Sequence, residues 1–284
     1  MNFAHSMQKF QDWFTQQWII IFGKKINPKD ESWLFGPFGE IDGIGEKFIN
    51  ELAVKENLTI SRNKNSVGLL KSFNSLNLPE SELNRLSKNV IDFYENTSDY
   101  KLYFKVRWNP FFKNFGFVVN RLFSQRINQL NIPTEQINEN EVLTSEIIQL
   151  IDKQSEEVKY TIWLRKIKSS SLVIYSGIYG TCILPSGTAC IKAIFPLPKG
   201  NATVILQPKI GDNRELILQS IGKKFGDPGF YFLLNDAKNN YWSQFHSSFT
   251  DELIVGEENQ KLHAKQTLKL WSLRVAIFEY VMDK

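Results

Sequence analysis

The sequence predicts an α+β protein built around a strongly curved or barrel-like antiparallel sheet of about 8–10 strands. Three observations predict this fold class. From Tyr160 onwards, apolar and polar residues alternate with a period of two, the connections are short and rich in turn residues, and helical patterns are concentrated in the first half. A sheet this long has to curl, close or be covered, because its apolar face would otherwise lie in water.

Helical periodicity marks four segments, mostly in the first half. They cover residues 2–22, 44–56, 80–94 and 115–130. In the first segment, apolar residues recur every three or four positions and predict the face that packs on the protein. These residues are Phe3, Met7, Phe10, Phe14, Trp18 and Ile21. The polar face lacks a basic excess, so packing on the protein is favoured over a helix lying on a membrane surface.

A glycine-rich loop at residues 35–45 precedes the second helix. It fits no phosphate-binding pattern, so a connection leading into that helix is favoured. In the first half, strands are predicted at 58–61 and at 100–108, where apolar and charged residues alternate cleanly. Residues 143–151 fit a strand or a helix, and a strand is favoured.

The second half predicts a meander of antiparallel strands. They span residues 158–168, 172–183, 188–195, 202–207, 215–221, 230–235, 241–249 and 262–282, with the last one bent or broken. Residues 172–175 and 202–206 are apolar on both faces, which is typical of central strands covered on one side by helices.

The predicted organisation is one α+β domain over residues 1–284. Residues 1–135 form its helix-rich part and contribute at least one strand, and residues 143–284 form the antiparallel meander. The layout is similar to that of lipocalin-like and helix-grip lipid-binding folds, a similarity of architecture without a shared sequence motif. Such a layout implies a pocket between sheet and helices.

Composition argues against several classes of protein. The net charge is +4 without a basic cluster, so no nucleic-acid partner is expected. The longest apolar run near the N-terminus, residues 18–22, is too short to span a bilayer, and no secretory signal is visible; the expected location is therefore cytoplasmic. His5, His246 and His263 lack metal-ligand spacing, so neither a metal nor another cofactor is predicted.

Cys182 and Cys190 flank the turn at residues 185–187 almost symmetrically. In a hairpin they would face each other, which leaves two interpretations. They form a redox-sensitive cross-strand disulfide, or they are two small buried thiols; the second is favoured in a reducing compartment.

Candidate ligand-binding residues come from three predicted strands. Trp163 and Arg165 share one strand face, and an inward arginine needs an acidic partner or marks an anionic ligand. Tyr179 adds an aromatic residue from the next strand. Trp242, Gln244 and His246 share a mixed polar and aromatic face, which fits either a cavity wall or a solvent-facing surface.

The function favoured by these patterns is binding, without catalysis, of a small apolar or amphipathic ligand between sheet and helices. Two alternatives remain open: an enzyme of unknown reaction that uses acid/base side chains in the same cavity, and an interaction protein with a filled core. No catalytic residues are identified, and the sequence does not indicate an oligomeric state.

Overall fold

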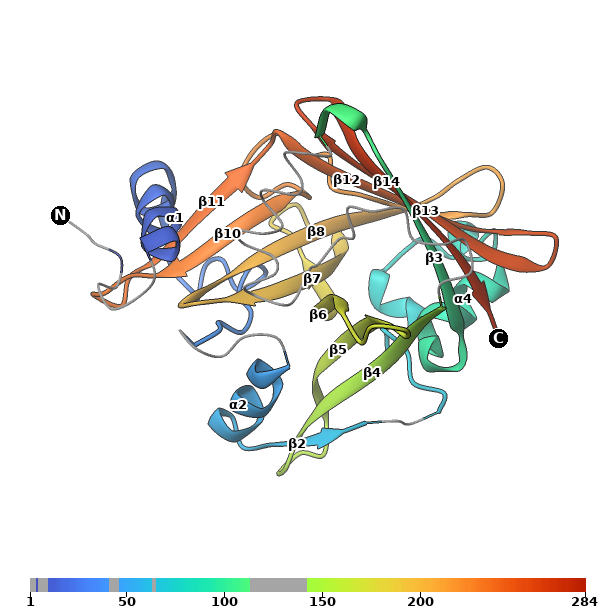
Figure 1. The fold of residues 1–284 in the computed structure, drawn as a ribbon, viewed down its shortest axis with the longest axis horizontal. Coiled ribbons are helices and arrows are strands. Elements are labelled where there is room, and N and C mark those ends of the chain that lie inside the picture. Colours follow the sequence, from blue (N-terminus) through green and yellow to red (C-terminus); the bar gives the residue numbers. More distant parts are fainter. Residues whose placement is uncertain (1–3, 5–9, 41–45, 63–64, 113–141) are drawn as a thin grey trace.

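A computed structural model describes residues 4, 10–40, 46–62, 65–112 and 142–284. Its main element is a 14-stranded sheet in which ten strands close into a ring in the order β8-β7-β6-β5-β4-β3-β14-β13-β12-β9, with β9 pairing back onto β8 (Figure 1). All strand pairs of the ring are antiparallel. The predicted fold class, a barrel-like antiparallel sheet with helices, is confirmed.

The ring strands come from both parts of the chain. They are β3 (Lys101–Trp108), β4 (Val142–Asp152), β5 (Val158–Ile167), β6 (Val173–Ile183), β7 (Ala189–Leu197), β8 (Gly200–Ile210), β9 (Leu216–Gln219), β12 (Phe249–Glu258), β13 (Lys261–Leu270) and β14 (Leu273–Asp283). Four strands lie outside the ring: β1 (Lys24–Ile26), β2 (Leu58–Ser61), β10 (Phe230–Asn235) and β11 (Tyr241–His246).

Strand β8 is the branch point of the sheet. One of its edges pairs with β7 along most of the strand. The other edge is divided: Gly200–Val204 pair with β10, and Gln207–Ile210 pair with β9. The ring therefore closes through β9, while β10, β11 and β1 continue the sheet outwards as a three-stranded flap (Figure 1).

The described helices take different positions around the ring. They are α1 (Phe10–Phe22), α2 (Lys47–Lys55), α3 (Glu80–Leu83) and α4 (Lys88–Glu95), with 3-10 turns η1 (Phe73–Leu76) and η2 (Thr97–Asp99). Figure 1 shows α1 beside the flap strands β10 and β11 and α4 at the far end of the barrel, near β3 and β13.

The predicted helix at 44–56 is confirmed as α2, which buries Phe48, Ile49 and Leu52. The predicted helix at 80–94 is divided into α3 and α4, because Ser87 starts a new helix as its N-cap and accepts a hydrogen bond from Asn89 N. The predicted helix at 115–130 lies outside the described residues.

The face of α1 differs from the one that the apolar stripe predicts. Phe14, Trp18 and Ile21 are 55%, 47% and 63% exposed, whereas Ile19 and Ile20 are buried. The contact with the flap decides this orientation, because Ile19 and Ile20 pack with Leu234. The stripe prediction was therefore wrong for these three residues, while Phe3, Met7 and the side chain of Phe10 lie outside the described residues. Hydrophobic periodicity identifies a helix but does not fix which apolar side meets the sheet.

Strand boundaries in the second half also differ in detail. The predicted strand at 262–282 is broken into β13 and β14, which pair with each other. Strand β12 was missed beyond Phe249. Strand β7 continues through Pro196, where Pro196 lies opposite Asn201, so the proline does not end the strand as proline commonly does.

The strands that are apolar on both faces are covered from outside. Helix α2 packs on Val173 of β6 and on Ile162 and Leu164 of β5. Ile205 of β8 is covered by residues 33–38, a segment without regular structure that includes Trp33 and Leu34. The cover predicted for these strands is thus present, but over β8 it is a loop and not a helix.

Lys192 holds that loop in place. Its Nζ atom donates hydrogen bonds of 2.9 Å to the carbonyl oxygens of both Trp33 and Phe35. Burial lowers the pKa of Lys192, because an apolar environment disfavours the charged form.

Cys182 and Cys190 lie directly opposite each other in the β6–β7 hairpin, as the sequence predicts. Both thiols are free and buried. Burial raises the pKa of Cys182 to about 11 and that of Cys190 to about 12. Thiolate, the reactive form, is therefore scarce at neutral pH.

We expect Gly200→Ala to destabilise the protein, because a Cβ atom at this position would lie 2.2 Å from the Leu233 carbonyl oxygen of β10. Overpacking of this kind costs about 1–3 kcal/mol. The matched control is Gly180→Ala in β6, where a Cβ atom meets nothing within 4 Å. The measurement is the free energy of unfolding in urea. Equal values for the two variants would contradict the close approach of β8 and β10.

The native protein is expected to react slowly with a thiol reagent at pH 8, and the unfolded protein to reveal both thiols quickly. A spectrophotometric thiol titration with and without denaturant makes this measurement. Recovery of thiols only after reduction would show instead that the two cysteines form a disulfide.

Candidate functional site

A cavity of about 540 Å³ runs through the ring. Alternate residues of the ring strands point into it, as the two-residue period of a strand requires. The pattern is clearest in four strands, which contribute Ala202, Val204 and Leu206; Phe249, Asp251, Leu253 and Val255; Ala264, Gln266 and Leu268; and Phe278, Tyr280 and Met282. Most of these side chains are apolar, so the ring encloses a hydrophobic interior with a few polar groups.

Helices and the flap extend the wall beyond the ring. At the α4 end, Phe93 and Tyr94 line the cavity and belong to the core cluster inside the barrel. At the flap end, the lining includes Ile19 of α1 together with Phe232 and Leu234 of β10. Figure 1 shows α4 and the flap on opposite sides of the molecule, so the lining residues come from both ends of the barrel.

Arg165 of β5 is the cation of this cavity. It is only 7% exposed, and its guanidinium carbon lies 4.3 Å from the ring centre of Trp163, 4.2 Å from that of Tyr175 and 5.4 Å from that of Tyr280. Cation–π contacts of this kind partly replace hydration. In the described part of the chain, Arg165 forms no ion pair, and its buried Nε atom has no hydrogen-bond partner.

Asp251 of β12 is the carboxyl group of the same cavity. Its backbone N–H donates to Ser220 Oγ at 2.7 Å, and Gln266 Nε2 donates to its Oδ2 atom at 2.7 Å. Its Oδ1 atom is buried without a hydrogen-bond partner in the described residues. Burial raises the pKa of Asp251 to about 7, with a smaller contribution from the charge of Glu252.

Two tyrosines connect Arg165 and Asp251. The charge of Arg165 favours ionisation of the Tyr175 and Tyr280 hydroxyls, while that of Asp251 opposes it. Burial is nevertheless the dominant effect: it raises the pKa of both hydroxyls, that of Tyr175 to about 12, so both remain protonated. Arg165 and Asp251 therefore lie in one polar region of an otherwise apolar cavity.

The structure brings three of the six predicted ligand-binding residues to this cavity: Trp163, Arg165 and Tyr179. Trp163 is fixed by a 2.8 Å hydrogen bond from its Nε1 atom to Ser145 Oγ. The Tyr179 hydroxyl interacts with that of Tyr94, and burial raises the pKa of Tyr179.

The other three residues lie on β11 in the flap and are not among the cavity lining. Trp242 donates a 3.0 Å hydrogen bond from Nε1 to Asp236 Oδ2. His246 packs edge-on against Phe232, with 5.2 Å between ring centres, and burial lowers its pKa. Gln244 lies opposite Phe232 in the β10–β11 pairing. Whether any of the six residues contacts a ligand remains a prediction.

Among the polar residues that line the cavity, Tyr175, Asp251, Gln266 and Tyr280 were missed in the sequence. Tyr280 alternates with Phe278 and Met282, so the period of two could have placed it inside. Asp251 offered no such signal, because an acidic residue at an inward position breaks the apolar pattern.

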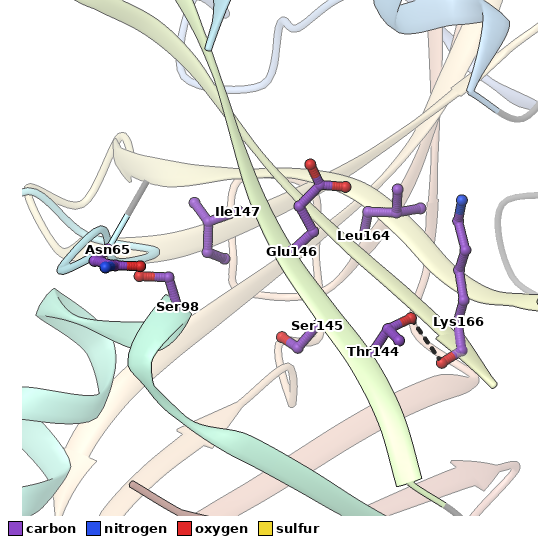
Figure 2. A pocket seen from close by; sticks show the side chains of 8 residues that line it. All are labelled: Asn65, Ser98, Thr144, Ser145, Glu146, Ile147, Leu164 and Lys166. Atoms are coloured by element: carbon purple, nitrogen blue, oxygen red, sulfur yellow. Dashed lines mark hydrogen bonds between the residues drawn. The ribbon is translucent and has the colours of Figure 1, made fainter. Parts of the chain in front are cut away.

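A second, polar hollow of about 380 Å³ lies over strands β4 and β5 (Figure 2). Its lining includes Glu146 and Lys166, and Figure 2 shows the hydrogen bond from Thr144 Oγ1 to the Lys166 carbonyl oxygen, 3.3 Å long. Its charged groups already have partners. Arg62 bridges Glu146 at 3.1 Å and Glu46 at 3.3 Å, and Lys166 pairs with Glu46.

Within the described ranges, no group of three or more His, Cys, Asp or Glu residues is arranged to hold a metal ion. In the same ranges, no helix combines the length and the apolar character needed to cross a membrane.

Comparison with known proteins gives one informative similarity. The chain is 26% identical over 190 residues to the uncharacterized membrane protein YndJ of Bacillus subtilis strain 168. The match covers 66% of this chain and 33% of the Bacillus protein, so the chain spans about a third of that protein's length. No family model matches the chain, and no solved structure matches it either.

Asp251 makes stability depend on pH in a defined direction. Because its pKa is raised in the folded state, the contribution of Asp251 to the free energy of unfolding is fully present below pH 3.8. This contribution is lost as the pH rises through about 7. A shift from 3.8 to about 7 corresponds to at most roughly 4 kcal/mol. We expect Asp251→Asn, which cannot ionise and can still accept the Gln266 hydrogen bond, to lose less stability than the wild type between pH 4 and pH 8.

Urea unfolding across this pH range measures the effect. Glu252→Gln is the control: Asp251 remains, so stability should still fall with pH, slightly less than in the wild type because the Glu252 charge no longer raises the Asp251 pKa. Parallel stability curves for the wild type and Asp251→Asn would contradict a buried carboxyl group with a raised pKa.

Proposed function

We propose that this protein binds a small apolar or amphipathic molecule inside the ring. The observation that carries the proposal is the cavity of about 540 Å³ with its mostly apolar lining. Protein interiors are normally close-packed, and cavities of this size are typical of ligand sites. The few polar groups, among them Arg165, Asp251 and Gln266, are suited to orienting a ligand.

Aromatic side chains supply much of the contact surface. Trp163, Tyr175 and Phe195 form edge-to-face pairs on one wall, with ring centres 5.8 and 5.3 Å apart. Phe230, Phe232 and Phe249 form a second group near the flap. Such rings bury large apolar areas and keep their positions, which favours the binding of an apolar chain or ring system.

A protein that acts only through its surface is expected to have a filled core, and the cavity does not agree with that expectation.

Catalysis is a second candidate function that one observation favours. Asp251 titrates near pH 7 in a site shielded from water, and general bases are tuned in this way. Recovery of an altered molecule after incubation with the wild type, but not with Asp251→Asn, would support catalysis over binding alone.

The cytoplasmic location expected from the sequence remains a prediction. The two free thiols agree with a reducing compartment. The similarity to part of a protein named a membrane protein makes association with a membrane the alternative to test.

Filling part of the cavity should weaken binding. Ala202→Phe adds a ring to the inner face of β8, and we expect it to lower the affinity for the neutral fluorescent probe N-phenyl-1-naphthylamine by at least about tenfold. The measurement is probe fluorescence during titration with protein, after extraction of any bound molecule from the purified sample.

The control is Lys209→Phe, which places the same ring on the exposed outer side of β8. It should bind the probe like the wild type. Thermal unfolding of both variants checks that they fold. Probe binding that is equal in the wild type and Ala202→Phe would contradict a binding site inside the ring.

A further inference from the structure

We propose that the ligand of the cavity carries a carboxylate head, which pairs with Arg165, and an apolar tail, which lies along the rest of the cavity. This inference rests on the proposed function and specifies the chemical class of the ligand. It starts from two unpaired polar atoms in the same region, Nε of Arg165 and Oδ1 of Asp251.

The guanidinium group of Arg165 is a buried positive charge without a counter-charge. No ion pair involves Arg165 in the described parts of the chain, although the residue is only 7% exposed. A buried charge is costly unless it is paired and hydrogen-bonded. An anion inside the cavity would provide the missing partner.

The surroundings of Arg165 determine how such an anion approaches. The rings of Trp163, Tyr175 and Tyr280 surround the guanidinium carbon at 4.2–5.4 Å, so apolar surface occupies much of the space around it. The Nε–H is buried without a hydrogen-bond partner among the described residues, and the side chain also hydrogen-bonds the Tyr280 hydroxyl. A carboxylate oxygen accepts such a hydrogen bond, because guanidinium and carboxylate are both planar and match in geometry.

Asp251 supports the same head group. The groups that act on its carboxyl are Gln266 through a hydrogen bond and Glu252 through its charge. Ser220 bonds only the Asp251 backbone, and the tyrosines at 175 and 280 respond to the charge of Asp251. Burial raises its pKa to about 7, so below that pH the group is neutral and carries an O–H. An O–H of this kind can donate a hydrogen bond to a carboxylate oxygen of the ligand.

Charge matching favours a carboxylate over a phosphate. The described lining of the cavity contains one cation, Arg165, and one acidic residue, Asp251. A carboxylate carries a single negative charge and neutralises Arg165. A phosphate monoester carries about −1.5 to −2 at neutral pH and would leave excess negative charge buried beside Asp251.

The rest of the lining is suited to the tail. Towards the flap the wall contains Ala202, Phe230, Phe232 and Leu234, which offer no charge to a ligand. Burial of methylene groups against such a wall is favourable at about 0.8 kcal/mol per group. A linear apolar chain can therefore extend along this wall towards the flap, with the head near β5 and β12.

Isothermal titration calorimetry at pH 6 with decanoate and 1-decanol tests the inference, because the two probes have the same chain and differ in the head. We expect the wild type to bind decanoate at least about tenfold more tightly than decanol. Arg165→Gln should remove this preference by weakening decanoate while decanol stays within about threefold. Arg165→Lys, which keeps the charge, should retain part of the preference.

Each of the other possible results overturns one specific part of the proposal. Binding of both probes with equal affinity, or a decanoate preference that Arg165→Gln leaves unchanged, would overturn the carboxylate site while the binding function stands. Stronger binding of decyl phosphate than of decanoate would overturn the choice of head. Failure of decanoate, decanol and the neutral naphthylamine probe alike would overturn the binding function itself. Thermal unfolding confirms that Arg165→Gln is folded.

Discussion

The divided edge of β8 is the constraint on which the rest of the architecture depends. A strand has two edges, and β8 uses one for β7 and shares the other between β10 and β9. Because β9 occupies the second part of that edge, the sheet closes and leaves few unpaired edges. Because β10 occupies the first part, the flap diverges there and places Phe230 and Phe232 beside the interior.

Closure alone does not explain why the interior stays open. The walls around β5, β6 and β8 are held from outside, where α2 and residues 33–38 bury the outward apolar side chains. Folding energy is thus obtained on both faces of the sheet, and the inner face does not have to collapse onto itself. Phe93 and Tyr94 of α4 fill one end of the barrel and leave the middle hollow.

The sequence allowed the sheet and half of the predicted site residues to be placed, because a period of two is a local property. Trp163 and Arg165 were assigned to one face, and that face is the cavity wall. Trp242, Gln244 and His246 were grouped correctly on one face of β11, but β11 lies outside the ring. The branch at β8 places β11 outside the ring, and that branch depends on pairing between strands that are distant in the sequence. The same limit applies to α1, whose buried face was set by the flap.

Asp251 and Arg165 cannot be explained as stabilising features of the fold. A buried carboxyl group with one unpaired oxygen and a buried guanidinium with an unpaired nitrogen both cost free energy. Apolar residues of similar size would pack against Trp163 and Tyr280 without that cost, since buried ion pairs can often be replaced without loss of stability. Two such groups in the lining of one cavity, both incompletely paired, are suited to a molecule that brings its own polar atoms. Local violations of good packing are expected at functional sites, and here they support the proposal that the interior of the ring is that site.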